Sequence, residues 1–137
     1  MSIASLAIAQ DKNDRSEQLE ARKVAFISTE LALSPIEAQS FWPLYNEYQQ
    51  RNKENKKKLR AVTRDKKANS ITEVEADELI TVVLEVEEEE LLLKKEYTQE
   101  LRKVIPASKI AKLYLLENKF KEKVLNKIKR KMKDKRR

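Results

Sequence analysis

The sequence predicts an all-α fold of four long amphipathic helices. Its 137 residues include no glycine, so we expect few connections that need the left-handed backbone at which glycine is usual. Two hydroxyl residues, Ser34 and Thr72, each precede a glutamate by three positions, which is the spacing of a helix capping box. Apolar residues recur every three or four positions over long stretches, which is the period of one helix face.

The first segment has the character of an export signal. Residues 2–9 form a short apolar run that ends in Ala7-Ile8-Ala9, an A-x-A cleavage motif. We therefore expect residues 1–9 to be the remnant of a signal peptide cleaved after Ala9, and residues 10–137 to form a single helical domain. No basic segment precedes the apolar run. Two alternatives therefore stay open, a start upstream of Met1 and an apolar N-terminus on a cytosolic protein.

The first helix is expected to run from about Ser16 to Leu33, after a polar and flexible lead that starts at Asp11. Its apolar residues have helical spacing, which predicts that one face is buried against another element. The candidate inward-facing residues are Leu19, Phe26, Ile27 and Leu31.

The second helix is expected to begin at Ser34 and to continue to about Lys67. The Ser34 hydroxyl can accept from the N–H of Glu37, and the Glu37 carboxylate can accept from that of Ser34. Pro35 takes the first helical position, where its missing N–H has no cost. Pro43 lies inside the helix and is expected to kink it. The apolar side chains at helical spacing are Ala38, Phe41 or Trp42, Tyr45, Tyr48, Leu59 and Val62.

A turn is expected at residues 67–70, with Asn69 in left-handed backbone as a helix cap. The third helix should begin near Thr72, whose hydroxyl forms a second capping box with Glu75, and run to about Val104. Its inward-facing residues are expected to be Ala76, Leu79, Val83, Val86, Leu93, Tyr97, Leu101 and Val104.

Pro106 marks the next break, because the residue before a proline leaves the helical region. The last helix is expected from about Ala107 to Lys133. Its inward-facing residues are predicted to be Ile110, Leu113, Leu116, Phe120, Val124 and Ile128. From Lys119 to Arg137 there are eleven basic residues and two acidic ones, so the domain ends in a basic C-terminal tail.

Charge is distributed in blocks along the two middle helices. Residues 51–67 contain nine basic and two acidic residues, whereas residues 73–90 contain nine acidic residues and no basic one. An antiparallel hairpin of these helices would bring the two blocks face to face. Surface ion pairs are individually weak, but this pattern favours the hairpin over other pairings.

The composition argues against an enzyme and against a metal centre. The chain contains no cysteine and no histidine, so it lacks thiolate ligands, imidazole ligands and the usual general base near neutral pH. Glu87 to Glu90 are consecutive on a helix and point in different directions, so they cannot converge on one cation. We expect no catalytic residue, no bound metal and no cofactor.

Two basic surfaces are candidates for binding a partner. The stretch from Gln49 to Lys58 has no apolar residue, so its helix is expected to stand in water or to meet a charged partner on every side. The basic tail is either a solubilising end or a contact for acidic proteins, anionic lipid headgroups or nucleic acid phosphates. The candidate partner-binding residues are Arg51, Lys57, Lys58, Arg60, Arg64, Lys127 and Lys131.

The Spy/CpxP family is what three features of the chain together resemble: the two capping boxes, the run Phe41-Trp42-Pro43-Leu44-Tyr45, and the later pattern Val104-Ile105-Pro106…Lys109…Ala111-Lys112-Leu113-Tyr114. They are similar to its short Bacteroidetes branch, labelled periplasmic heavy-metal sensors or sensors of ECF-type sigma factors. The Leu-Thr-x-x-Gln motif of the family is filled here by Leu33-Ser34-x-x-Glu37 and Ile71-Thr72-x-x-Glu75, with glutamate for glutamine.

The resemblance implies an open, hairpin-based cradle of four helices in the periplasm, with homodimer formation left open. It also implies an ATP-independent chaperone or envelope-stress sensor-type protein that binds unfolded or signalling proteins. Heavy-metal sensing fits poorly, because the chain lacks soft-metal ligands. Two other functions stay open: a regulatory partner of one envelope sensor, and a cytosolic basic protein that binds nucleic acid nonspecifically.

Overall fold

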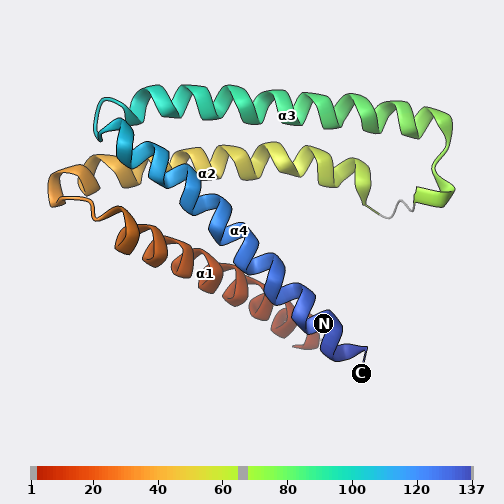
Figure 1. Ribbon diagram of the computed structural model, residues 1–137. Helices are drawn as coiled ribbons and strands as arrows, with labels where there is room; N and C mark the ends of the chain where they lie inside the picture. Colours follow the sequence, from red (N-terminus) through yellow and green to blue (C-terminus); the bar gives the residue numbers. More distant parts are fainter. Residues whose placement is uncertain (1–2, 65–67, 137) are drawn as a thin grey trace. The chain divides into compact units, whose positions relative to one another are not determined.

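The computed structural model describes residues 3–64 and 68–136, and it confirms the all-α fold. Over these residues the chain forms four α-helices and one short 3-10 helix (Figure 1). They are α1 (Ile3–Leu31), α2 (Pro35–Thr63), η1 (Ala68–Ser70), α3 (Glu73–Leu101) and α4 (Ala107–Lys135). The helices pair as α2 with α3 and as α1 with α4. None of these helices is long and apolar enough to cross a membrane.

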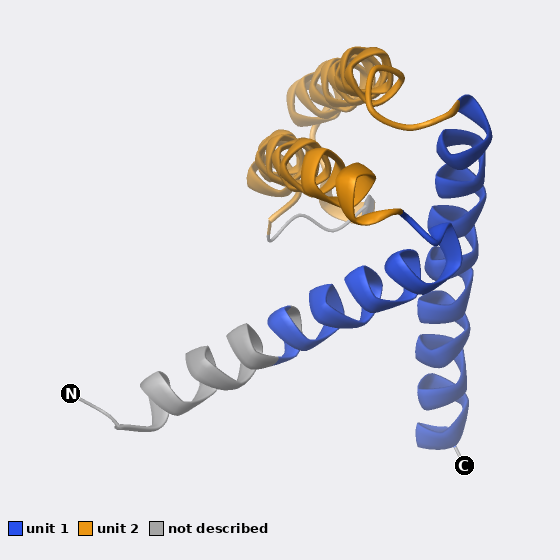
Figure 2. Ribbon diagram, turned by 90° about the vertical axis from the view of Figure 1, so that its left-hand side faces the viewer, with its two compact units in different colours: residues 1–33, 107–137 blue, residues 34–106 orange. Residues whose placement is uncertain are grey.

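The chain divides into two compact units, each made of one helix pair (Figure 2). Unit 1 contains residues 1–33 and 107–137, and therefore the pair α1 and α4. Unit 2 contains residues 34–106, and therefore the pair α2 and α3. The expected hairpin packing is confirmed. The cradle, the dimer and the folding of residues 10–137 as one domain stay predictions.

The expected start of the first helix near Ser16 is wrong, because α1 begins at Ile3. The polar stretch from Asp11 to Ser16, expected as a flexible lead, is helical. No glycine or proline interrupts the chain before Pro35, so neither of the two residues with the poorest helix propensity ends the helix in this stretch. Whether export removes residues 1–9 stays a prediction.

The prediction of left-handed backbone at Asn69 is also wrong. Asn69 lies within η1, and the left-handed residue among those described is Ala32, with φ of 47°. Ala32 directly follows the last residue of α1, which is the position where helices commonly end in left-handed backbone. Its carbonyl accepts a hydrogen bond of 3.2 Å from Nζ of Lys109 in α4. This bond ties the end of α1 to its partner helix.

Both predicted N-terminal caps are confirmed. The Glu37 N–H donates to Oγ of Ser34 at 3.2 Å, and the Ser34 N–H donates to Oε1 of Glu37 at 3.0 Å, which completes the capping box. In α3 the Glu75 N–H donates to Oγ1 of Thr72 at 3.2 Å. Such a cap contributes about 1 kcal/mol to helix stability. Helix α2 runs on through Pro43, and the kink expected there stays a prediction.

Unit 2 is an antiparallel hairpin with an aromatic core at one end. The rings of Tyr48 in α2 and Tyr97 in α3 lie 5.4 Å apart, and Phe41 stacks on Tyr45 at 5.4 Å. The buried apolar residues of this unit are Phe41, Tyr45, Val86, Leu93, Tyr97, Leu101 and Ile105. Most of them belong to the inward-facing sets that the sequence predicts. Their burial is the main source of stability for the hairpin.

The charged blocks face one another as expected. Nζ of Lys56 lies 3.7 Å from a carboxylate oxygen of Glu90, which joins the two blocks, and Arg51 lies 3.2 Å from Glu96, which follows the acidic block along α3. Both pairs join α2 to α3, and both are largely exposed to solvent. Exposed pairs contribute little stability, so their role here is to favour this pairing and register over others.

The expectation that residues 49–58 are solvated on every side is wrong at Asn55. Only 4% of Asn55 is exposed, and its Nδ2 donates a hydrogen bond of 2.9 Å to the backbone carbonyl of Val86 in α3. The hairpin brings this face of α2 against α3 although it carries no apolar side chain. A buried amide is tolerated there because a backbone carbonyl can accept a second hydrogen bond.

Candidate functional site

Unit 1 contains two apolar helix faces that meet at one end and diverge toward the other. On α1, Leu31 is 2% exposed whereas Leu19 is 45% exposed. On α4, Leu113 is 2% exposed whereas Ile128 is 49% exposed. Figure 2 shows the described parts of the two helices moving apart in the same direction. The apolar faces are therefore longer than the contact between the helices, and their open ends face solvent.

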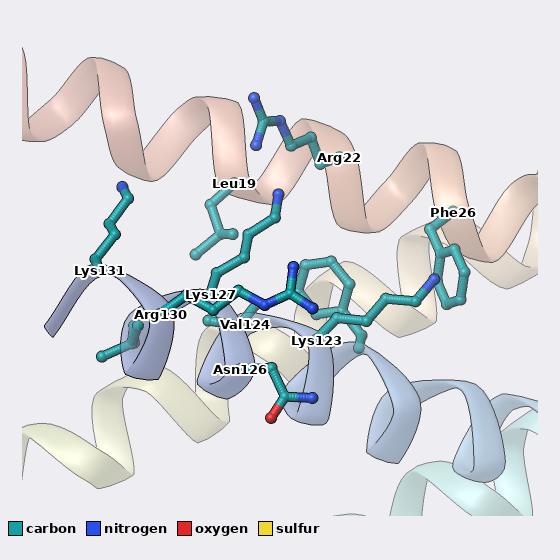
Figure 3. A pocket seen from close by; sticks show the side chains of 11 residues that line it. Leu19, Arg22, Phe26, Lys123, Val124, Asn126, Lys127, Arg130 and Lys131 are labelled. Atoms are coloured by element: carbon teal, nitrogen blue, oxygen red, sulfur yellow. The ribbon is translucent and has the colours of Figure 1, made fainter. Parts of the chain in front are cut away.

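A groove of about 550 Å³ lies between these diverging faces, and we call it the basic groove. Figure 3 shows it from close by. It is lined by Leu19, Arg22 and Phe26 of α1 and by Phe120, Lys123, Val124, Asn126, Lys127, Ile128, Arg130 and Lys131 of α4. A smaller adjoining cleft of about 370 Å³ shares four of these residues and adds Glu20, Lys23, Lys121 and Leu125.

The inner end of the groove is held by an aromatic pair. The rings of Phe26 in α1 and Phe120 in α4 lie 6.2 Å apart, within the range of favourable ring contacts. Nζ of Lys123 lies 4.7 Å from the centre of the Phe26 ring, which is a cation–π distance, and Figure 3 shows its ammonium group beside that ring. These contacts hold Lys123 along the groove.

The groove combines an apolar floor with a cationic rim. Leucine, isoleucine, valine and two phenylalanine side chains form the floor, and five lysine or arginine side chains belong to the lining. The lining residues of the basic groove include no carboxylate. The positive charges therefore add up to an attractive potential for anions. The floor offers apolar contact to whatever the charge attracts.

The groove offers binding rather than chemistry. Its lining contains neither a nucleophile paired with a base nor a pair of carboxylates. Throughout the part of the chain with described side chains, no three acidic residues are grouped so that they could hold a metal ion. The arrangement is suited to a ligand that is apolar on one side and negatively charged on its flanks.

Two of the predicted partner-binding residues, Lys127 and Lys131, belong to the groove. Sequence reasoning missed Leu19, Arg22 and Phe26 as their partners across the groove. The available signal was the apolar period of the last helix, which continues to Ile128, together with that of the first helix, which continues back to Leu19. What the sequence could not show is that the two faces separate.

The other five predicted residues belong to unit 2: four lie on α2, and Arg64 directly follows its last residue. Arg51 is used within the hairpin: its Nη1 donates to the Tyr97 hydroxyl at 3.2 Å and to Glu96 at 3.2 Å. The bond to Tyr97 first, and then the bond to Glu96, raise the pKa of Arg51 above its usual value. The remaining four, Lys57, Lys58, Arg60 and Arg64, are exposed. The four capping residues Ser34, Glu37, Thr72 and Glu75 are structural.

Comparisons of this chain with models of known protein families, with curated proteins and with solved structures give no match. The resemblance to the Spy/CpxP family therefore stays a prediction.

Proposed function

We propose that the protein binds flexible polypeptides reversibly through the basic groove, as an exported chaperone that works without ATP. The observation that carries this proposal is the apolar floor under a rim of five cations. Unfolded proteins expose apolar side chains, and those with acidic segments are attracted to such a rim. Export to the periplasm belongs to the same proposal and is supported by the apolar run before Gln10.

The expected binding is weak, which suits release without an energy source. A client side chain that buries about 100 Å² of apolar surface gains about 2.5 kcal/mol at 25 cal/mol per Å². Two or three such contacts gain about 5–7.5 kcal/mol, and once the cost of ordering the client is subtracted the dissociation constant is expected to be on the order of 0.1 mM or weaker. Charge then increases the rate of capture more than it increases the affinity.

An aggregation assay tests this function. The purified protein is expected to suppress light scattering by an acidic denatured client at near-stoichiometric ratios, in low salt and without nucleotide. Leu19→Ser should weaken suppression, because it removes part of the groove floor. Leu115→Ser is the matched control, since Leu115 is 64% exposed on α4 and does not line the groove. Equal activity of the two variants, or no suppression by the unmodified protein, would refute the proposal.

Two further measurements separate the proposal from its alternatives. The intact mass of protein recovered from the periplasm should correspond to a chain that begins at Gln10. Uncleaved protein found in the cytoplasm would favour the nucleic acid alternative instead. Affinity capture from membranes that returned one sensor protein, without suppression of aggregation, would favour a dedicated regulatory partner.

A further inference from the structure

The chemistry of the groove restricts the conformation of its ligand. The lining residues lie inside α1 and α4, so their backbone N–H and C=O groups are already used by helical hydrogen bonds. The lining side chains of the basic groove are apolar or cationic, apart from Asn126. Figure 3 shows Asn126 projecting from the side of α4 that is turned away from α1. The space between the helices therefore offers donors but few acceptors.

An extended peptide would be poorly satisfied in such a groove. Each of its residues carries an N–H that needs an acceptor, and a buried N–H without one costs about 1–3 kcal/mol. Sheet edges provide such acceptors, but a groove between two helices does not. A ligand helix satisfies its own backbone and leaves only side chains to be matched. The groove is therefore better suited to a helix than to an extended chain.

The spacing of the lining residues sets the pattern of the ligand. Phe120, Val124 and Ile128 recur every four residues and extend over about 12 Å of α4, at 1.5 Å per residue. Lys123 and Lys127 are also four residues apart and run beside them. A helix lying along this floor would match it with apolar residues at i, i+4 and i+7. Carboxylates on the flanks of that helix would meet the cations of α4 and of Arg22 on α1.

We infer that the basic groove binds an acidic amphipathic helix of a partner protein, which completes a three-helix arrangement with α1 and α4. This inference rests on the proposed function and narrows its ligand from flexible polypeptide to segments that fold into such a helix. A lipid bilayer fits the groove less well, because the half-buried side chains of Phe120 and Val124 lie between two helices. Nucleic acid would use the cations and leave the apolar floor exposed.

The test uses a fluorescently labelled peptide of about 18 residues, long enough to extend past the floor of the groove at 1.5 Å per residue. It carries leucine at i, i+4 and i+7 and glutamate on both flanks. A peptide of the same composition in scrambled order has the same charge but no apolar face. Fluorescence anisotropy measures the binding of each to the full chain. Far-UV circular dichroism measures the gain of helix on mixing.

The patterned peptide is expected to bind at least about tenfold more tightly than the scrambled one and to gain helix on binding. Its affinity should decrease as the salt concentration increases. Lys127→Glu should weaken binding about tenfold, whereas Lys129→Glu should have little effect. Lys129 is exposed on the same helix as Lys127 but does not line the basic groove. The two substitutions change the net charge of the protein by the same amount.

Three outcomes would overturn the inference: equal binding of the two peptides, binding without a gain of helix, or equal effects of the two lysine variants. Binding to anionic vesicles that Lys127→Glu abolishes, with no peptide binding, would assign the groove to lipid. Failure of the patterned peptide with intact suppression of aggregation would refute this inference alone. Failure of the patterned peptide to bind together with no suppression of aggregation would refute the proposed function as well.

Discussion

Replacing Asn55 by leucine is expected to stabilise unit 2. Asn55 is 4% exposed, and its amide forms one hydrogen bond of 2.9 Å to the Val86 carbonyl. Its carbonyl oxygen Oδ1 is buried without a hydrogen-bond partner among the described residues. The native asparagine therefore has one satisfied and one unsatisfied polar group in the interface between α2 and α3.

The expected change in the free energy of unfolding for Asn55→Leu is the sum of three contributions. Loss of the hydrogen bond to Val86 costs about 1 kcal/mol, while the Val86 carbonyl keeps its bond within α3. Removal of the unsatisfied Oδ1 recovers about 1–3 kcal/mol. Burial of a leucine side chain gains about 1.5–3 kcal/mol, part of which is lost to imperfect packing. The net expectation is a stabilisation of about 2 kcal/mol, or an increase in Tm of about 5–10 °C for a chain of this size.

Thermal and urea unfolding followed by circular dichroism at the helix band measure this change. Asn46→Leu is the matched control, because Asn46 is exposed on the same helix, and its Tm should change little. A Tm of the Asn55→Leu variant at or below that of the unmodified protein would show that the amide contributes more than the unsatisfied oxygen costs.

Three further changes have expected outcomes. Ala32→Gly should stabilise the protein by about 1 kcal/mol in urea unfolding, because glycine adopts positive φ without the steric cost that alanine has. Ser34→Ala should destabilise it by about 1 kcal/mol in the same assay through loss of the α2 cap, whereas the exposed Ser108 should tolerate alanine. Phe26→Ala should lower Tm by removing the ring contact with Phe120, and it should also weaken peptide binding in the anisotropy assay.

The features that the sequence predicts correctly are those that neighbouring residues determine. The Ser34–Glu37 box and the Thr72 cap are local, so their spacing alone is enough. The pairing of α2 with α3 is not local. It could still be predicted, because many residues of opposite charge in the two blocks favour the same pairing. Lys56 and Glu90 meet as that pattern predicts.

The features that the sequence does not reveal depend on tertiary contacts. Asn55 is buried because the helix axis brings it against α3, although nothing in residues 49–58 is apolar. Ala32 adopts left-handed backbone although alanine disfavours it, at a position where its carbonyl accepts a hydrogen bond from Lys109 of α4. The groove is a property of two helices that separate. The periodicity of each helix shows only that it has an apolar face.

The charge of the groove gives a physical reason for it to stay open. The apolar faces of α1 and α4 continue past their contact, so burial alone would favour closing the groove. Closure would bring Arg22 of α1 toward Lys123 and Lys127 of α4, and like charges brought together in a less polar environment repel strongly. A ligand with carboxylates on its flanks removes that repulsion while its apolar face covers the exposed floor. The same cations would therefore oppose closure and select the charge of what can fill the space between the helices.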